Sequence, residues 1–208
     1  MPIEKRWVVK PQGDRATVEA LSAELGMSPV LTNLLVQRGI DTMEKAKKFF
    51  SPSLRDLHDP FLMKDMDKAV ERIERAVKAG EKVMIYGDYD VDGTTAVALV
   101  YKFLSQIGHK NLSFYIPDRY VDGYGISIRS IEHALRKGVT LVIALDCGIK
   151  AVEKVAYAKE RGVDFIICDH HLPAEEIPQA VAVLDPKRTD CNYPFDELSG
   201  CGVGFKLV

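Results

Sequence analysis

The chain lacks several features by which whole classes of protein are recognised. It has 208 residues, and no apolar run approaches the ~20 residues that a membrane-spanning helix requires. Residues 1–7 carry charged side chains and not the apolar core of a signal peptide. No internal repeat and no low-complexity tract is present. We therefore expect a globular, cytoplasmic protein with no attachment to a membrane.

Cysteine is scarce, and its spacing argues against a structural zinc site. The four cysteines, Cys147, Cys168, Cys191 and Cys201, form no Cys-x-x-Cys pair. They suit a reducing compartment, in which small thiols fill apolar space. We assign none of them a catalytic role.

An excess of positive charge is also missing. The chain has 28 Lys and Arg against 30 Asp and Glu, for a net charge of −2. Nucleic-acid binders usually present a basic face, so the composition neither supports nor excludes such a partner. A length of 208 residues is enough for one α/β domain with a full core and a helical appendage.

The order of apolar segments predicts two regions. Residues 1–64 are predicted to be helical, with helices near residues 30–38 and 45–50. An amphipathic helix over residues 65–78 then leads into a regular alternation of strands and helices over the rest of the chain. Strands are predicted near residues 83–85, 112–116, 141–145, 165–168 and 181–184, with helices beginning near residues 94, 127 and 152. This alternation predicts right-handed βαβ units on a parallel, doubly wound α/β sheet.

The most informative segment is Gly-Asp-Tyr-Asp-Val-Asp-Gly at residues 87–93. It places three carboxylates, those of Asp88, Asp90 and Asp92, at alternate positions directly after a predicted buried strand. Two unit charges about 4 Å apart repel by roughly 4 kcal/mol at an effective dielectric constant near 20. Converging aspartates therefore need protons, a cation or divergent side chains, and we favour a bound metal ion.

The segment also matches two other patterns. The same spacing begins a calcium-binding EF-hand loop, but the twelfth position is Leu99, where a bidentate Glu is required. A strand also precedes the segment where an EF-hand needs a helix. Alternatively, Asp92 is a suitable N-cap for the helix predicted from residue 94. Capping explains one carboxylate and leaves the other two without a role.

Two further predicted strands end in similar polar residues. The strand over residues 141–145 is followed by Asp-Cys-Gly, and that over residues 165–168 by Asp-His-His. Taken singly, Asp146 is also suited to cap the next helix, and His170 to be an ordinary loop residue. In parallel α/β sheets, however, ligands collect outside the carboxyl ends of the strands. We therefore expect the three motifs to converge on one crevice.

Together, these three motifs resemble motifs I, II and III of the DHH phosphoesterase superfamily. Residues 116–127 and the glycine-rich residues 198–207, which predict a tight helix entry, resemble its RecJ branch of single-strand-specific DNA exonucleases. The resemblance implies a Rossmann-like DHH domain over residues 65–208. It also implies a second domain and a fourth ligating aspartate beyond residue 208, so that the chain is expected to be a fragment with little exonuclease activity alone.

The resemblance implies two divalent metal ions. It makes Asp90, Asp92, Asp146 and His170 the metal-ligand candidates, with Asp146 between the two ions and Asp88 either a ligand or an orienting neighbour. The mixture of carboxylate and imidazole donors favours Mn2+ and permits Mg2+.

The remaining candidates concern the substrate. Adjacent histidines rarely reach one ion from the same side, so His171 is expected to contact the scissile phosphate; its alternative is a packing role behind the ligands. The catalytic candidates are therefore Asp90, Asp92, Asp146, His170 and His171. Arg119 is a candidate for phosphate binding and Tyr124 for base stacking, and each is equally suited to anchor its loop.

The resulting hypothesis is a metal-dependent 5′ to 3′ exonuclease that releases mononucleotides from single-stranded DNA in recombination and repair. Substrate, polarity and pathway follow from the resemblance alone. Contacts with a single-strand-binding protein and a helicase would lie outside this chain. The alternatives are a phosphodiesterase for short oligonucleotides or cyclic dinucleotides, and a non-catalytic binding module. The last is disfavoured because every ligand position of the three motifs is filled.

Overall fold

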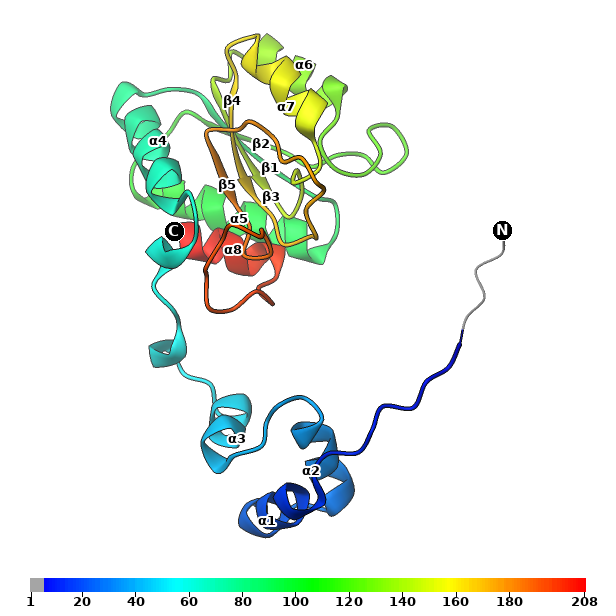
Figure 1. Ribbon diagram of the computed structural model, residues 1–208. Coiled ribbons are helices and arrows are strands. Elements are labelled where there is room, and N and C mark those ends of the chain that lie inside the picture. Colours follow the sequence, from blue (N-terminus) through cyan, green and yellow to red (C-terminus); the bar gives the residue numbers. More distant parts are fainter. Residues whose placement is uncertain (1–5) are drawn as a thin grey trace. The chain divides into compact units, whose positions relative to one another are not determined.

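The computed structural model describes residues 6–208 and is shown in Figure 1. Its internal contacts divide the chain into two compact units, Met1–Leu57 and His58–Val208. The sequence placed the start of the second region at residue 65. The second unit begins earlier because Met63 is buried in its core and because Lys206 Nζ donates to His58 O over 2.7 Å.

The described part of the first unit is built from three short helices and one 3-10 turn. These are α1 (Arg15–Leu25), α2 (Pro29–Val36), α3 (Met43–Phe50) and η1 (Leu54–Asp56). Each α-helix begins at a polar N-cap whose side-chain oxygen accepts a backbone N–H, in order Asp14, Ser28 and Thr42. The helices α2 and α3 match the two predicted ones, whereas α1 was not singled out from the sequence.

The second unit is a parallel five-stranded sheet with helices on both faces. Its elements are η2 (Pro60–Leu62), α4 (Met66–Ala79), β1 (Val83–Gly87), α5 (Val91–Gln106), β2 (Leu112–Tyr115), α6 (Ile128–Arg136), β3 (Leu141–Leu145), α7 (Val152–Lys159), β4 (Asp164–Cys168), β5 (Ala182–Leu184) and α8 (Gly200–Leu207). The strand order is β2-β1-β3-β4-β5, and every pairing is parallel. The predicted α/β fold class is therefore confirmed.

Alternate residues of each strand enter opposite halves of the core. In β1, Val83 and Ile85 belong to the cluster that includes residues of α4, α5 and α8, whereas Met84 and Tyr86 belong to the cluster with α6 and α7. Figure 1 shows these two sets of helices on opposite sides of the sheet. Because both faces are covered, the central strands are continuous apolar runs, which made them readable from the sequence.

In the part of the chain that the structure describes, no helix combines the length and the apolar composition needed to cross a membrane.

Candidate metal centre at the carboxyl ends of the strands

The turn from β1 to α5 carries the first group of acidic residues. Asp88 follows the strand directly and is buried, while Asp90 is the N-cap of α5 and accepts the N–H of Gly93 over 3.0 Å. The turn is tight because a Cβ on Gly93 would lie 2.4 Å from Asp88 O. Only glycine fits there, and the close approach fixes the two carboxylates relative to each other.

This turn corrects one expectation about Asp92. The residue does not cap α5, because the helix begins one turn earlier than predicted, with Asp90 as its N-cap. Asp92 instead lies in the first turn, where its two oxygens accept the N–H groups of Gly200 and Cys201, each over 2.7 Å. A carboxylate offers about four lone-pair positions. Asp92 therefore retains the capacity to bind a cation.

Asp146 follows β3 and is the most constrained of the acidic residues. Its N–H donates to Cys168 O over 2.8 Å, which extends the pairing of β3 with β4 by one bond. Its φ of 60° lies in the left-handed region, which non-glycine residues adopt at a cost of order 1–3 kcal/mol. The side chain is buried, at 2% relative exposure of the residue. Such strain is typical of functional positions.

Asp169, at the end of β4, holds the paired histidines in place. Asp169 is 1% exposed. Its carboxylate accepts hydrogen bonds from the backbone N–H groups of Ile149, His170 and His171, at 2.9, 2.7 and 3.2 Å. The carboxylate also lies 2.7 Å from His171 Nδ1. Because an ionised carboxylate only accepts, Nδ1 is the donor and Nε2 is the nitrogen directed elsewhere.

The two histidines point to different partners. His170 Nε2 lies 3.1 Å from Asp146 Oδ1 and 3.8 Å from Asp92 Oδ2. By contrast, His171 Nε2 lies 3.2 Å from the hydroxyl of Tyr124. The two histidines therefore differ in their polar partners, although each has a ring nitrogen within 4.8 Å of a carboxylate oxygen of Asp146.

Among the described residues, two groups of side chains could hold a metal ion, and they share one member. Asp88, Asp90 and Asp146 form the first group, and Asp146, His170 and His171 form the second, with ligand atoms within 4.8 Å of one another in each group. Asp146 belongs to both groups, and its expected role as a bridging ligand stays a prediction. Asp92, expected as a ligand, belongs to neither group, and His171, expected to contact the phosphate, belongs to the second.

The electrostatics of the site fit a cation. Asp88 Oδ1 and Asp146 Oδ1 are buried and accept no hydrogen bond, although His170 Nε2 lies 3.1 Å from the Asp146 oxygen. Burial, and then the charges of Asp92 and Asp90, raise the pKa of Asp146 to about 7. Burial likewise raises the pKa of Asp88. A divalent ion would supply the missing partner for both oxygens, and the mixed donors suit Mn2+.

The candidate substrate residues lie on the rim. Tyr124 packs edge-on against His171 and Tyr89, with ring centroids 6.1 and 6.5 Å apart. The guanidinium of Arg119 lies 5.4 Å from the centre of the Tyr89 ring. The structure thus places Tyr124 beside the histidine pair. Arg119 contacts the Tyr89 ring, and its positive charge partly offsets the rise in the pKa of Asp88.

Sequence reasoning missed two residues of this region. Asp169 was noticed only as part of a motif, and its four contacts show that it positions both histidines. Asp185 follows β5, is fully buried with Oδ2 unpartnered, and has its pKa raised to about 6 by burial. The signal for Asp185 was available, since it too is an acidic residue directly after an apolar strand.

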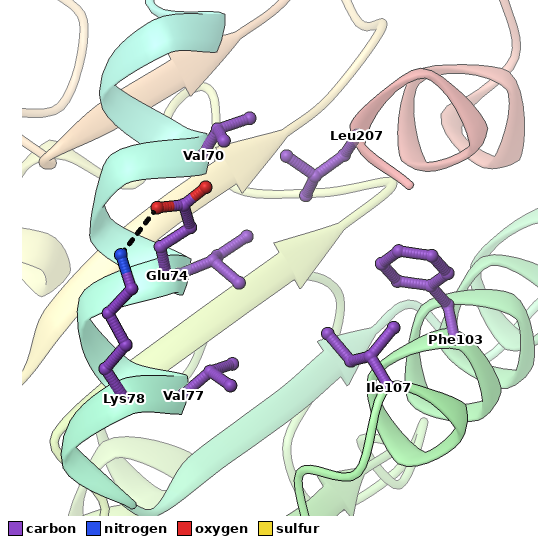
Figure 2. Close-up of a pocket in the computed structure, with 8 residues that line it drawn as sticks. Val70, Glu74, Val77, Lys78, Phe103, Ile107 and Leu207 are labelled. Atoms are coloured by element: carbon purple, nitrogen blue, oxygen red, sulfur yellow. Dashed lines mark hydrogen bonds and ion pairs between the residues drawn. The ribbon is translucent and has the colours of Figure 1, made fainter.

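An apolar hollow, drawn in Figure 2, has a volume of about 280 Å3, and none of the residues of these motifs lines it. It is lined by Val70, Ile73, Glu74, Val77 and Lys78 of α4, Phe103 and Ile107 beside them, and Leu207 of α8. Of these, only Glu74 and Lys78 are charged, and they pair with each other over 3.0 Å. The hollow offers neither a ligand for a metal nor an unpaired cation for a phosphate.

Comparison with known proteins shows the family of the chain. The model of the DHH family, N-terminal domain, matches residues 82–208, so the chain belongs to the DHH family. The chain is 43% identical over 203 residues to the single-stranded-DNA-specific exonuclease RecJ of Bacillus subtilis, covering 98% of this chain and 26% of that protein. It is 33% identical over 188 residues to the Escherichia coli exonuclease of the same name, covering 90% and 32%.

Solved structures give the same picture. A crystal structure of exonuclease RecJ bound to manganese superposes with a TM-score of 0.63 at 30% identity, over 70% of this chain and 36% of that one. The RecJ of Thermus thermophilus in complex with Mn2+ gives 0.70 at 26% identity, over 97% and 28%. The chain thus spans about a quarter to a third of the length of its relatives.

Proposed function

We propose that the protein is a metal-dependent phosphodiesterase that degrades single-stranded DNA from the 5′ end and releases mononucleotides. The observation that supports this most strongly is Asp146, a buried carboxylate shared by two groups of metal-competent side chains, with an oxygen that accepts no hydrogen bond. The relatives at 43% and 33% identity are both named single-stranded-DNA-specific exonucleases, which favours DNA over short oligonucleotides or cyclic dinucleotides.

Asp88, Asp90, Asp92, Asp146 and His170 would hold two divalent ions. When bound, such ions lower the pKa of a water and stabilise the attacking and leaving oxygens of an in-line displacement. The residues of the chain hold the metal ligands and the histidines in position. The Gly93 turn fixes Asp88 and Asp90, the left-handed backbone of Asp146 turns its carboxylate into the crevice, and Asp169 orients the histidines.

The rim residues would hold the substrate. His171, whose Nδ1 donates to Asp169, directs Nε2 toward the Tyr124 hydroxyl. With both ring nitrogens protonated, Nε2 would donate to a phosphate oxygen in place of this contact. Tyr124 and Arg119 are exposed on the rim, where an aromatic ring stacks on bases and a guanidinium binds phosphate. A single-strand-binding protein and a helicase would act through other parts of a longer protein, and the site of action would be the cytoplasm.

The test follows release of mononucleotides from single-stranded and duplex DNA labelled at either end. A polypeptide extended to the length of the relatives should degrade the single strand from its 5′ end only when Mn2+ is present, and Asp146→Ala should abolish this activity. Residues 1–208 alone are expected to release little. Equal degradation of the duplex, or cleavage that persists in Asp146→Ala, would refute the proposal.

A further inference from the structure

The first turn of α8 lies against two acidic residues of the metal centre. The N–H groups of Gly200 and Cys201 donate to the two oxygens of Asp92, each over 2.7 Å. The next N–H, that of Gly202, donates to the N-cap Ser199 over 3.1 Å. The free N–H groups of a helix start carry partial positive charge, which favours a carboxylate at this position.

Gly200 itself is in contact with Asp146. A Cβ at this position would lie 2.4 Å from Asp146 Oδ1, 2.5 Å from its Cβ and 2.6 Å from its Cγ. Real Cβ atoms do not approach other heavy atoms so closely, and the neighbour here is a buried side chain at the end of a strand. Gly200 is not among the glycines with a left-handed backbone. A glycine is therefore required because a Cβ would collide with Asp146. The backbone conformation at this position does not itself call for glycine.

We propose that Gly200 and Cys201, the first two residues of α8, are positioning elements of the metal centre, because their N–H groups hold Asp92 and Gly200 confines Asp146. The inference rests on the proposed metal binding and goes further, because it assigns a role to a helix that contributes no ligand. Asp92 keeps lone pairs free toward His170, whose Nε2 lies 3.8 Å away.

The rest of α8 explains why its first turn can act as a fixed support. Val203, Gly204 and Lys206 are buried, and α8 packs against α5, β3 and β4. A Cβ on Gly204 would lie 3.3 Å from Leu145 Cδ2. At the other end of the helix, Lys206 Nζ donates to His58 O over 2.7 Å. The position of the first turn is therefore set by contacts along the whole helix.

Three alanine variants of the same helix test the proposal by Mn2+ titration calorimetry and thermal melting. Gly200→Ala should lower Mn2+ affinity by about tenfold or more, in the range seen when groups that support metal ligands are changed. Gly202→Ala should bind as the parent does, because its added Cβ would come no closer than 3.4 Å to any neighbour. Gly204→Ala should lower the melting temperature without lowering Mn2+ affinity. Parent-like affinity in Gly200→Ala, or an equal loss in Gly204→Ala, would overturn the inference.

A second measurement needs neither metal nor a folded Gly200→Ala variant. In metal-free protein, Asp92→Ala should speed amide hydrogen exchange at Gly200 and Cys201 and leave the Ser199-capped amide of Gly202 unchanged. The matched variant Asp90→Ala should speed exchange at Gly93 only. Unchanged exchange at Gly200 and Cys201 in Asp92→Ala would overturn the inference. Absence of Mn2+ binding by the parent would instead contradict the proposed function. The exchange rates would still show whether Asp92 holds the amides of Gly200 and Cys201.

Discussion

The two ends of the parallel sheet differ in whether their acidic side chains have hydrogen-bond partners. At the amino ends of the strands, Arg72 of α4 donates to Asp164 Oδ2 over 2.6 Å and to Glu81 Oε2 over 2.7 Å. Thr140 adds a hydroxyl donor to the same Glu81 oxygen over 2.6 Å. At the carboxyl ends, Asp88 and Asp146 each have a buried oxygen that accepts no hydrogen bond.

The pKa shifts at the two ends follow from this difference. The hydrogen bond from Arg72 lowers the pKa of Glu81, so that ionised Glu81 stabilises the fold. Burial raises the pKa of Asp88 and Asp146, so that their ionisation opposes the fold. One end of the sheet is thus built for stability. The other holds carboxylates in an unfavourable state that a cation would relieve, as is typical of functional sites.

The largest expected effect is at the carboxyl ends. Asp146→Ala removes the residue common to both ligand groups, so Mn2+ affinity should fall by about 100-fold or more at both positions together. Titration calorimetry measures this directly. The control is Glu71→Ala, which removes an exposed acidic side chain on α4 and should bind Mn2+ as the parent does. Undiminished affinity in Asp146→Ala would remove the basis for the metal centre.

The two adjacent histidines at the carboxyl ends of the strands are expected to have different roles. His170→Ala should weaken Mn2+ binding, because His170 Nε2 faces Asp146 and Asp92. His171→Ala should leave the metal bound and lower turnover by about 10²–10³-fold if it stabilises developing charge on the phosphate. Calorimetry together with turnover by the extended polypeptide separates the two effects. Equal loss of metal in both variants would show that the division of roles is wrong.

The sequence predicted those features of the two sheet ends that depend on residues adjacent in the chain. The apolar strands and the acidic residues after β1, β3 and β4 could be read because each motif is contiguous. The partners of Asp92 could not, since Gly200 lies 108 positions further along the chain. The same applies to Arg72 and Asp164, which are 92 positions apart. The roles of the predicted site residues stay predictions until ligands and activity are measured.

A third prediction concerns the stable end. Arg72→Ala leaves Glu81 and Asp164 without their buried cation, which should lower the free energy of unfolding by about 3 kcal/mol. Mn2+ affinity should not change, because the ion pairs lie at the opposite end of the strands. Chemical denaturation gives the stability, and Arg75→Ala, an exposed arginine of the same helix, is the matched control. A loss of metal affinity as large as the loss of stability would mean that the two ends are not independent.

The smallest expected effect is the pH dependence of the metal-free protein. The pKa of Asp146 is raised to about 7 and that of Asp185 to about 6, both by burial, from an ordinary value of 3.8. Between the ordinary and the raised values the folded state holds more protons than the unfolded state, so stability falls as pH rises. We expect the free energy of unfolding to fall as the pH rises from about 5 to about 7, and to change little between pH 7 and pH 8.

Melting temperatures across this pH range, with and without Mn2+, test the expectation. Asp146→Asn should be less sensitive to pH than the parent, because its amide does not ionise and the main contribution is gone. Added Mn2+ should restore the parent at pH 8 and have little effect on Asp146→Asn, since the stabilisation by a ligand grows with the logarithm of its concentration relative to Kd. A metal-free parent whose stability rises from pH 5 to pH 8 would contradict the raised pKa of Asp146, because Glu81, whose pKa is lowered, contributes little pH dependence above pH 5.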